Sequence, residues 1–314
     1  MNYISEINKL RKEKNAIILA HYYQSDDIQA IADYVGDSLA LAQWAKKTDA
    51  DIIVMCGVHF MGETAKILSP NKKVLIPDAA AGCSLADSCE LKDLKKFIKE
   101  HPDHKVISHV NTTAAVKTVT DVVVTSTNAK QIVESFPKDQ KIIFGPDRNL
   151  GGYINSITGR NMVLWNGGCH VHARFTVKNI ERLKNKYPDA LVLTHPECDK
   201  SVVEISDYVG STAGILKFAT NSDKKYFIIT TEGGIMYKLK EQNPDKVFIS
   251  ASETDSCSCD EICGVCEYMR YNTIEKLYNC LKNESPEILL DEKIIKKAVK
   301  PISKMLEISE KLGL

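Results

Sequence analysis

Ten cysteines are the first residues of this 314-residue chain whose type and number point to chemistry. They are Cys56, Cys83, Cys89, Cys169, Cys198, Cys257, Cys259, Cys263, Cys266 and Cys280. Clustered thiols in a reducing compartment are more often metal ligands or redox groups than structural disulfides. The question that the sequence poses is therefore which of these sulfur atoms the fold brings together.

Three histidines recur along the chain, each at the end of a short apolar segment. His21, His109 and His195 are 88 and 86 residues apart. Further polar side chains recur two and seventeen residues after each histidine: Tyr23, Asn111 and Glu197, then Ser38, Ser126 and Thr212. A single histidine at a strand end is as readily structural as functional. Because three positions recur with one period, we expect these residues to line a common cavity. His59, His101, His104 and His170 have no such support.

The elements that must position these side chains follow the same period. A period well above about 50 residues is too long for a solenoid unit, so each copy is interpreted as a small domain. Apolar runs without alternation predict strands covered on both faces, and strands alternating with helices predict parallel sheets. We expect first strands at 17–20, 106–108 and 191–194, helical segments at 27–34, 113–118 and 200–207, and second strands at 52–55, 121–125 and 226–230.

The fold class expected from this pattern is α/β, with three pseudo-symmetric domains. The predicted ranges are 1–84, 85–171 and 172–270, followed by C-terminal helices at 271–314 that pack on the outside. The recurring polar residues follow strands or begin helices, which places them at the carboxyl edge where open α/β sheets bind ligands. Helix amino termini at that edge favour phosphate or carboxylate groups.

Charge and hydropathy exclude several kinds of partner. Lysine plus arginine and aspartate plus glutamate each number 41, so the chain lacks the cationic excess that nucleic-acid binding requires. No apolar run approaches the 18 or more residues of a membrane span, and the first residues do not resemble an export signal. We therefore expect a cytoplasmic protein that binds small molecules and neither nucleic acid nor membrane.

The thiols fall on the repeat. Cys83 follows His21 by 62 residues and Cys169 follows His109 by 60, while the corresponding stretch of the third copy contains Cys257, Cys259, Cys263 and Cys266. One thiolate from each of three domains could hold an iron–sulfur cluster with one iron left open, as a Lewis-acid catalyst requires. Four isolated cysteines are expected to be buried packing residues: Cys56, Cys89, Cys198 and Cys280.

Two other interpretations of the cysteines stay open at this point. Cys263 and Cys266, with a histidine, could bind zinc in a lyase or hydrolase. The loop from Cys257 to Cys266 could instead act as a redox or iron-sensing switch without catalysis.

Several motifs together resemble one enzyme family. They are Pro77-Asp-x-x-Ala-Gly-Cys83-Ser-Leu-Ala-Asp87, Val110-Asn-Thr-Thr-Ala-x-Val-Lys117, Trp165-x-Gly-x-Cys169-x-Val-His172, His195-Pro-Glu-Cys198 and Thr231-Glu-Gly233. In this order, and over residues 14–275, the chain resembles the quinolinate synthase (quinolinate synthetase A) family. The resemblance implies three α/β/α domains of three layers each around a central active site. It also implies condensation of iminoaspartate with dihydroxyacetone phosphate to quinolinate, with loss of phosphate and water, at a three-cysteine [4Fe–4S] cluster.

The resemblance also assigns cluster ligands. Cys83 and Cys169 correspond by motif, and Cys266 by its Cys-x-x-Met context, with Cys263 and Cys257 as the competing choices. His109 stands where the family usually has tyrosine, so the role of that tyrosine does not transfer intact.

For the reaction, Glu197 is the expected base, with a pKa raised towards neutrality, and His195 and Tyr23 are its partners. The expected substrate-binding residues are His21, Ser38, His109, Asn111, Ser126, His172, Ser211 and Thr212. An enzyme that produces iminoaspartate is a possible partner.

Overall fold

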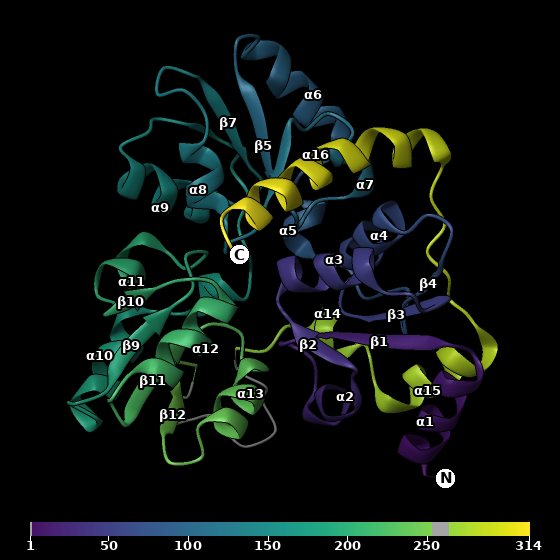
Figure 1. Cartoon of the computed structure of the whole chain (residues 1–314). Coiled ribbons are helices and arrows are strands. Elements are labelled where there is room, and N and C mark those ends of the chain that lie inside the picture. The colour runs from purple at the N-terminus through teal and green to yellow at the C-terminus, as the bar shows by residue number, and fades with distance from the viewer. Residues whose placement is uncertain (1, 253–263) are drawn as a thin grey trace.

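Three parallel sheets of four strands each form the framework of the protein (Figure 1). The computed structural model describes residues 2–252 and 264–314. The first sheet has the order β2-β1-β3-β4, from Tyr34–Gly36, Ala16–His21, Ile52–Cys56 and Lys73–Leu75. The second is β6-β5-β7-β8, from Val122–Val124, Lys105–His109, Ile142–Gly145 and Val163–Leu164. The third is β10-β9-β11-β12, from Tyr208–Val209, Leu191–Thr194, Tyr226–Thr230 and Val247–Ser250. The predicted fold class is confirmed.

An equivalent hydrogen bond occurs in each of the three domains and accounts for one recurring aspartate of the sequence. The carboxylates of Asp33, Asp121 and Asp207 each accept the backbone N–H of the residue fifteen positions earlier, at 2.8 Å. In each domain this bond fastens the chain that precedes the edge strand (β2, β6 or β10) to the central strand beside it. Equivalent side chains therefore occupy equivalent places in all three domains.

The edge strands correct two expectations from the sequence. Tyr34–Gly36 and Tyr208–Val209 are strands, although their apolar residues are too few to separate them from the preceding helical segments. The predicted strand at 121–125 is the edge strand β6 and is equivalent to these two, whereas 52–55 and 226–230 are the inner strands β3 and β11. The three segments predicted as second strands are therefore not equivalent in the three domains.

Helices cover both faces of each sheet. The first domain has α1 Tyr3–Glu13, α2 Asp26–Ile31, α3 Ser38–Lys47 and α4 His59–Leu68. The second has α5 Ser84–Asp87, α6 Leu91–Glu100, α7 Ala114–Lys117, α8 Ala129–Glu134 and α9 Arg148–Thr158. The third has the 3₁₀ turn His172–Arg174, α10 Val177–Lys186, α11 Lys200–Glu204, α12 Thr212–Asn221 and α13 Ile235–Gln242. Strands such as β3 are fully buried, which explains their apolar runs without alternation.

The C-terminal region holds α14 Glu267–Arg270, α15 Ile274–Asn283 and α16 Glu292–Lys311. Helix α15 packs against α1, and α16 packs against α4, α7 and β6, so it joins the first two domains (Figure 1). Ile302 and Met305 of α16 are fully buried in that contact. The three sheets lie inside the predicted ranges 1–84, 85–171 and 172–270, and the boundaries themselves remain predictions.

Candidate active site

A cavity lies where the carboxyl ends of the strands from the three sheets meet. About 770 Å³ of space free of protein atoms lies within it, including open solvent at its mouth. Apart from the competing ligands Cys257 and Cys263, which lie outside the described residues, all the residues assigned to catalysis, binding or metal ligation line this cavity. They are Tyr23, His195 and Glu197; His21, Ser38, His109, Asn111, Ser126, His172, Ser211 and Thr212; and Cys83, Cys169 and Cys266. Their roles remain predictions.

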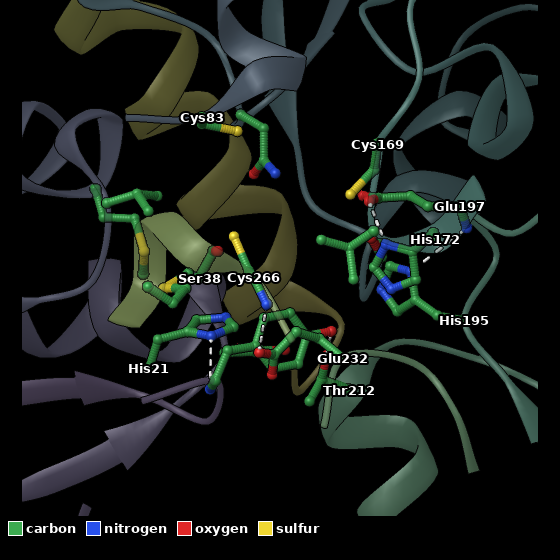
Figure 2. Close-up of a pocket in the computed structure, with 18 of the residues that line it drawn as sticks. His21, Ser38, Cys83, Cys169, His172, His195, Glu197, Thr212, Glu232 and Cys266 are labelled. Atoms are coloured by element: carbon green, nitrogen blue, oxygen red, sulfur yellow. Dashed lines mark hydrogen bonds and ion pairs between the residues drawn. The ribbon is translucent and has the colours of Figure 1, made fainter. Parts of the chain in front are cut away.

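The three cysteines of this group come from three separate segments of the chain. Cys83 follows β4, Cys169 follows β8 and Cys266 precedes α14, and their sulfur atoms point towards a common space (Figure 2). Cys257, Cys259 and Cys263 lie outside the described residues. Cys56, Cys89, Cys198 and Cys280 are buried away from this cavity, as expected for packing residues.

The surroundings of the three thiols fit an iron–sulfur cluster. Desolvation raises the pKa of Cys83 to about 12 and that of Cys266 to about 11. Backbone N–H groups two and three residues further along the chain oppose this shift, at Leu85 and Ala86 for Cys83 and at Tyr268 and Met269 for Cys266. Such N–H groups stabilise cluster-bound thiolates, whereas a metal-free thiol would stay protonated in this cavity.

Two buried carboxylates fix the backbone of two of these cysteines. The Cys266 N–H donates to Glu232 Oε1 at 3.0 Å, and the Gly234 N–H donates to Glu232 Oε2 at 2.7 Å. The Cys169 N–H donates to Asp147 Oδ2 at 3.3 Å. Sequence reasoning missed both carboxylates, although Glu232 lies in the quoted Thr231-Glu-Gly233 motif directly after a strand.

Glu197 and His172 form an ion pair in the lining of the cavity, on the same side as Cys169 (Figure 2). Glu197 Oε2 lies 3.3 Å from His172 Nδ1, and Glu197 Oε1 lies 3.8 Å from His109 Nε2. Burial opposes charge on both groups. The His172 imidazole and the neighbouring histidines nevertheless lower the pKa of Glu197 well below its usual range. The sulfur of Cys169 and the carboxylate of Glu197 raise the pKa of His172 to about 10.

This electrostatic arrangement differs from the expectation that Glu197 would have a raised pKa. Three histidines surround the carboxylate, and the hydrogen bond from His172 is the largest of the effects that together outweigh desolvation. The pair therefore consists of an ionised Glu197 and a protonated His172. Two titratable groups whose environments move their pKa values apart are a recurrent basis for assigning base and acid.

Neutral groups surround the ion pair. Burial lowers the pKa of His21 and of His195 to about 3, and the His195 ring stacks on His172 with 4.5 Å between centroids. The Tyr23 hydroxyl lies 2.7 Å from Thr212 Oγ1 and 2.9 Å from Thr231 Oγ1. Thr231 Oγ1 in turn lies 3.0 Å from His172 Nε2, so a chain of hydroxyls connects Tyr23 to the imidazole.

Two hydroxyl groups in the lining of the cavity lie at helix starts. Ser38 is the first residue of α3 and Thr212 is the first residue of α12. Among the described residues that line the cavity there is no lysine or arginine. The buried Lys117 lies behind this lining, and its ammonium group donates to the carbonyls of Val110 and Thr112 on either side of Asn111. Burial lowers the pKa of Lys117 to about 8.

A second set of possible metal ligands overlaps the first. Within the described residues, ligand atoms of Cys169, His172 and Glu197 all lie within 4.8 Å of one another. This set has the donor types of a single zinc ion, which takes thiolate, imidazole and carboxylate ligands.

The fold and the cavity define an enzyme whose active site lies between three α/β domains. A family model described as "Quinolinate synthetase A protein" matches residues 5–307. The chain therefore belongs to the quinolinate synthetase A family, as the motifs suggested.

Curated relatives agree with this assignment. The chain is 51% identical over 311 residues to the quinolinate synthase of Chloroherpeton thalassium, covering 99% of this chain and 95% of that protein. It is 51% identical over 303 residues to the quinolinate synthase of Microcystis aeruginosa, covering 96% of this chain and 94% of that protein.

No helix in the described ranges combines the length and apolar character that crossing a membrane requires.

Proposed function

We propose that the protein condenses iminoaspartate with dihydroxyacetone phosphate to form quinolinate, with loss of phosphate and water. The observation that carries the proposal is one cavity lined by three thiols from three segments and by an ionised carboxylate paired with an imidazolium. Family membership and relatives named quinolinate synthase support it.

Cys83, Cys169 and Cys266 would hold a [4Fe–4S] cluster. When bound, the cluster supplies an iron without a protein ligand, which acts as a Lewis acid. The role of the polypeptide chain is to hold the three sulfur atoms in one place. The backbone N–H groups beside Cys83 and Cys266 and the carboxylates of Glu232 and Asp147 perform that task.

Glu197 is the proposed base and His172 the proposed acid. Glu197 is ionised, so its carboxylate can accept a proton from a substrate carbon. His172 carries the proton that a departing oxygen needs, and Thr231 and the stacked His195 ring orient it. Tyr23 stays protonated because burial raises the pKa of its hydroxyl well above the usual value, and it can donate a hydrogen bond.

Neutral donors bind the phosphate and carboxylate groups of the substrates in this proposal. Ser38, Asn111, Ser126, Ser211 and Thr212, with His21 and His109, line the cavity. Helix amino termini and hydroxyls can bind anions without a lysine or arginine where water is excluded.

Cofactor-loaded protein tests this function. Protein reconstituted anaerobically with iron and sulfide is expected to form quinolinate from chemically generated iminoaspartate and dihydroxyacetone phosphate. Cys83→Ser, Cys169→Ser and Cys266→Ser should each abolish the intact cluster, whereas the buried control Cys280→Ser should keep it. If Cys266→Ser keeps the cluster and Cys263→Ser loses it, the third ligand is Cys263. Absence of quinolinate from loaded wild-type protein would disprove the function.

The set Cys169, His172 and Glu197 favours one alternative, a zinc-dependent lyase or hydrolase. Metal analysis separates the two. One zinc per chain in colourless protein would support the alternative, and four irons with acid-labile sulfide would exclude it.

We place the enzyme in the cytoplasm, where reduced thiols persist. Its iminoaspartate would come from a separate enzyme that produces this compound.

A further inference from the structure

Each of the three cysteines in the cavity is followed directly by a polar residue, and these three residues contact one another. Ser84 follows Cys83, His170 follows Cys169 and Glu267 follows Cys266. Ser84 Oγ lies 2.5 Å from His170 Nδ1, and His170 Nε2 lies 3.1 Å from Glu267 Oε2. A continuous hydrogen-bonded chain thus runs across three segments that follow three different sheets. The recurring pattern of histidines had not indicated a role for His170.

The chemistry of the three groups fixes the direction of these bonds. An ionised carboxylate only accepts, so the Nε2–H of His170 donates to Glu267. In the tautomer with its hydrogen on Nε2, Nδ1 is an acceptor, and the Ser84 hydroxyl donates to it. Histidine suits this place because its two ring nitrogens can accept on one side and donate on the other.

The three residues lie between the thiols and solvent. Ser84 and His170 line the cavity, while the side chains of His170 and Glu267 are 27% and 50% exposed. The next residue, Tyr268, reinforces the arrangement. Its ring packs edge-on against His170, with 6.0 Å between the ring centroids. The ring also lies close to Gly82, where a Cβ built on the glycine would be 3.6 Å from it.

Backbone hydrogen bonds do not perform this linkage in the described residues. The carbonyls of Cys83, Cys169 and Cys266 accept from Asp87, Ala173 and Met269, each within its own segment. The carboxylates that accept from the Cys169 and Cys266 amides follow strands of the second and third sheets, and within the described residues neither is hydrogen-bonded to the Cys83 segment. The side chains of Ser84, His170 and Glu267 connect all three.

We propose that Ser84, His170 and Glu267 form a clasp that holds the three cysteine segments at the spacing that a shared metal group requires and slows loss of that group. The inference rests on the proposed function only in taking Cys83, Cys169 and Cys266 as the ligands. All three clasp members are positioning residues, because none of them carries a ligand sulfur or belongs to the Glu197–His172 pair.

The test uses Ser84→Ala, His170→Ala and Glu267→Ala, with His101→Ala as a matched control. His101 is a partly exposed histidine at the end of α6 and does not line the cavity. Anaerobically loaded proteins are mixed with an iron chelator, and iron release is followed by absorbance. Each clasp variant should release iron roughly three- to tenfold faster than wild type, the effect of losing about one hydrogen bond. The control should match wild type.

Non-additive effects of the substitutions on iron release distinguish a clasp from three independent surface contacts. The double variant Ser84→Ala/Glu267→Ala should release iron no faster than His170→Ala, because each removes the same two bonds. The low-temperature EPR spectrum of the reduced cluster should shift in clasp variants and stay unchanged in His101→Ala. Wild-type release rates and spectra in all clasp variants would overturn the proposal.

A readout without the cluster keeps the inference distinct from the proposed function. In metal-free protein, alkylation of Cys83, Cys169 and Cys266, followed by peptide mass spectrometry, should be roughly three- to tenfold faster in Ser84→Ala than in wild type, relative to Cys280. If wild type binds no cluster but Ser84→Ala still accelerates alkylation, the function fails and the clasp stands. Equal alkylation in every variant would remove the clasp whatever the metal content.

Discussion

Replacing Glu197 by glutamine removes one negative charge from the centre of the cavity while preserving the shape of the side chain. Glu197 is 3% exposed, and its oxygens lie 3.3 Å from His172 and 3.8 Å from His109. The amide cannot accept a proton, and the loss of the carboxylate also lowers the pKa of His172. The single substitution therefore removes the proposed base and makes His172 lose its proton more readily.

The expected cost follows from those two losses. A general acid–base group contributes roughly 10²–10⁴ to the rate. Glu197→Gln should therefore lower kcat by about two to four orders of magnitude, or about 3–5 kcal/mol of transition-state stabilisation. KM for dihydroxyacetone phosphate should change by less than about tenfold, because the hydroxyl groups proposed to bind phosphate are untouched.

Anaerobic single-turnover measurements of quinolinate, with iron and sulfide determined on the same sample, provide the assay. The variant must keep the iron and sulfide content of wild type for the comparison to report on proton transfer. The control is Glu63→Gln, because Glu63 is also buried but accepts the Ala114 N–H outside the cavity. A kcat near that of wild type in loaded Glu197→Gln would refute the assignment of the base.

Three further predictions concern groups around the pair. Glu232→Ala leaves the N–H groups of Cys266 and Gly234 without their acceptor, so it should lower the free energy of unfolding by about 1–3 kcal/mol and reduce cluster content; unchanged urea midpoint and iron content would contradict this. Lys117 has a pKa of about 8 in the folded protein, against the usual 10.5 in the unfolded chain. Between these two pH values its amine is protonated mainly in the unfolded state. The free energy of unfolding of wild type, relative to that of Lys117→Met, should therefore rise by about 1–3 kcal/mol across that pH range. If the urea midpoints of the two proteins differ by the same amount at pH 7.5 and at pH 10, the lowered pKa is wrong. Ser38→Ala should raise KM for dihydroxyacetone phosphate by about three- to tenfold with little change in kcat, as loss of one hydrogen bond predicts, and an unchanged KM would remove Ser38 from the phosphate site.

The sequence predicted much of the framework because the fold repeats itself. Residues at one period must occupy equivalent places in equivalent domains, so His21, His109 and His195 could be assigned to one cavity without a structure. Short edge strands such as Tyr208–Val209 were missed, because two residues carry too little periodicity to be separated from a neighbouring helix.

Contacts between domains lay beyond the reach of the sequence. The pKa of Glu197 depends on how many histidines surround it, and the pattern did not reveal that His172 and His109 both lie beside it. Glu232 and His170 act through partners far away in the chain, 34 and 86 residues distant. The residues at the equivalent places are of different types, such as Ser84 for His170 and Asp147 for Glu232, so no recurring side chain identified them.

The measurement that tests the central claim most directly is diffraction from crystals of the anaerobically loaded protein, recorded at the iron absorption edge. We predict four iron positions in one cube, with the sulfur atoms of Cys83, Cys169 and Cys266 each bound to a different iron and no protein atom on the fourth. A fourth protein ligand, or a single metal ion bound by Cys169, His172 and Glu197, would contradict the account.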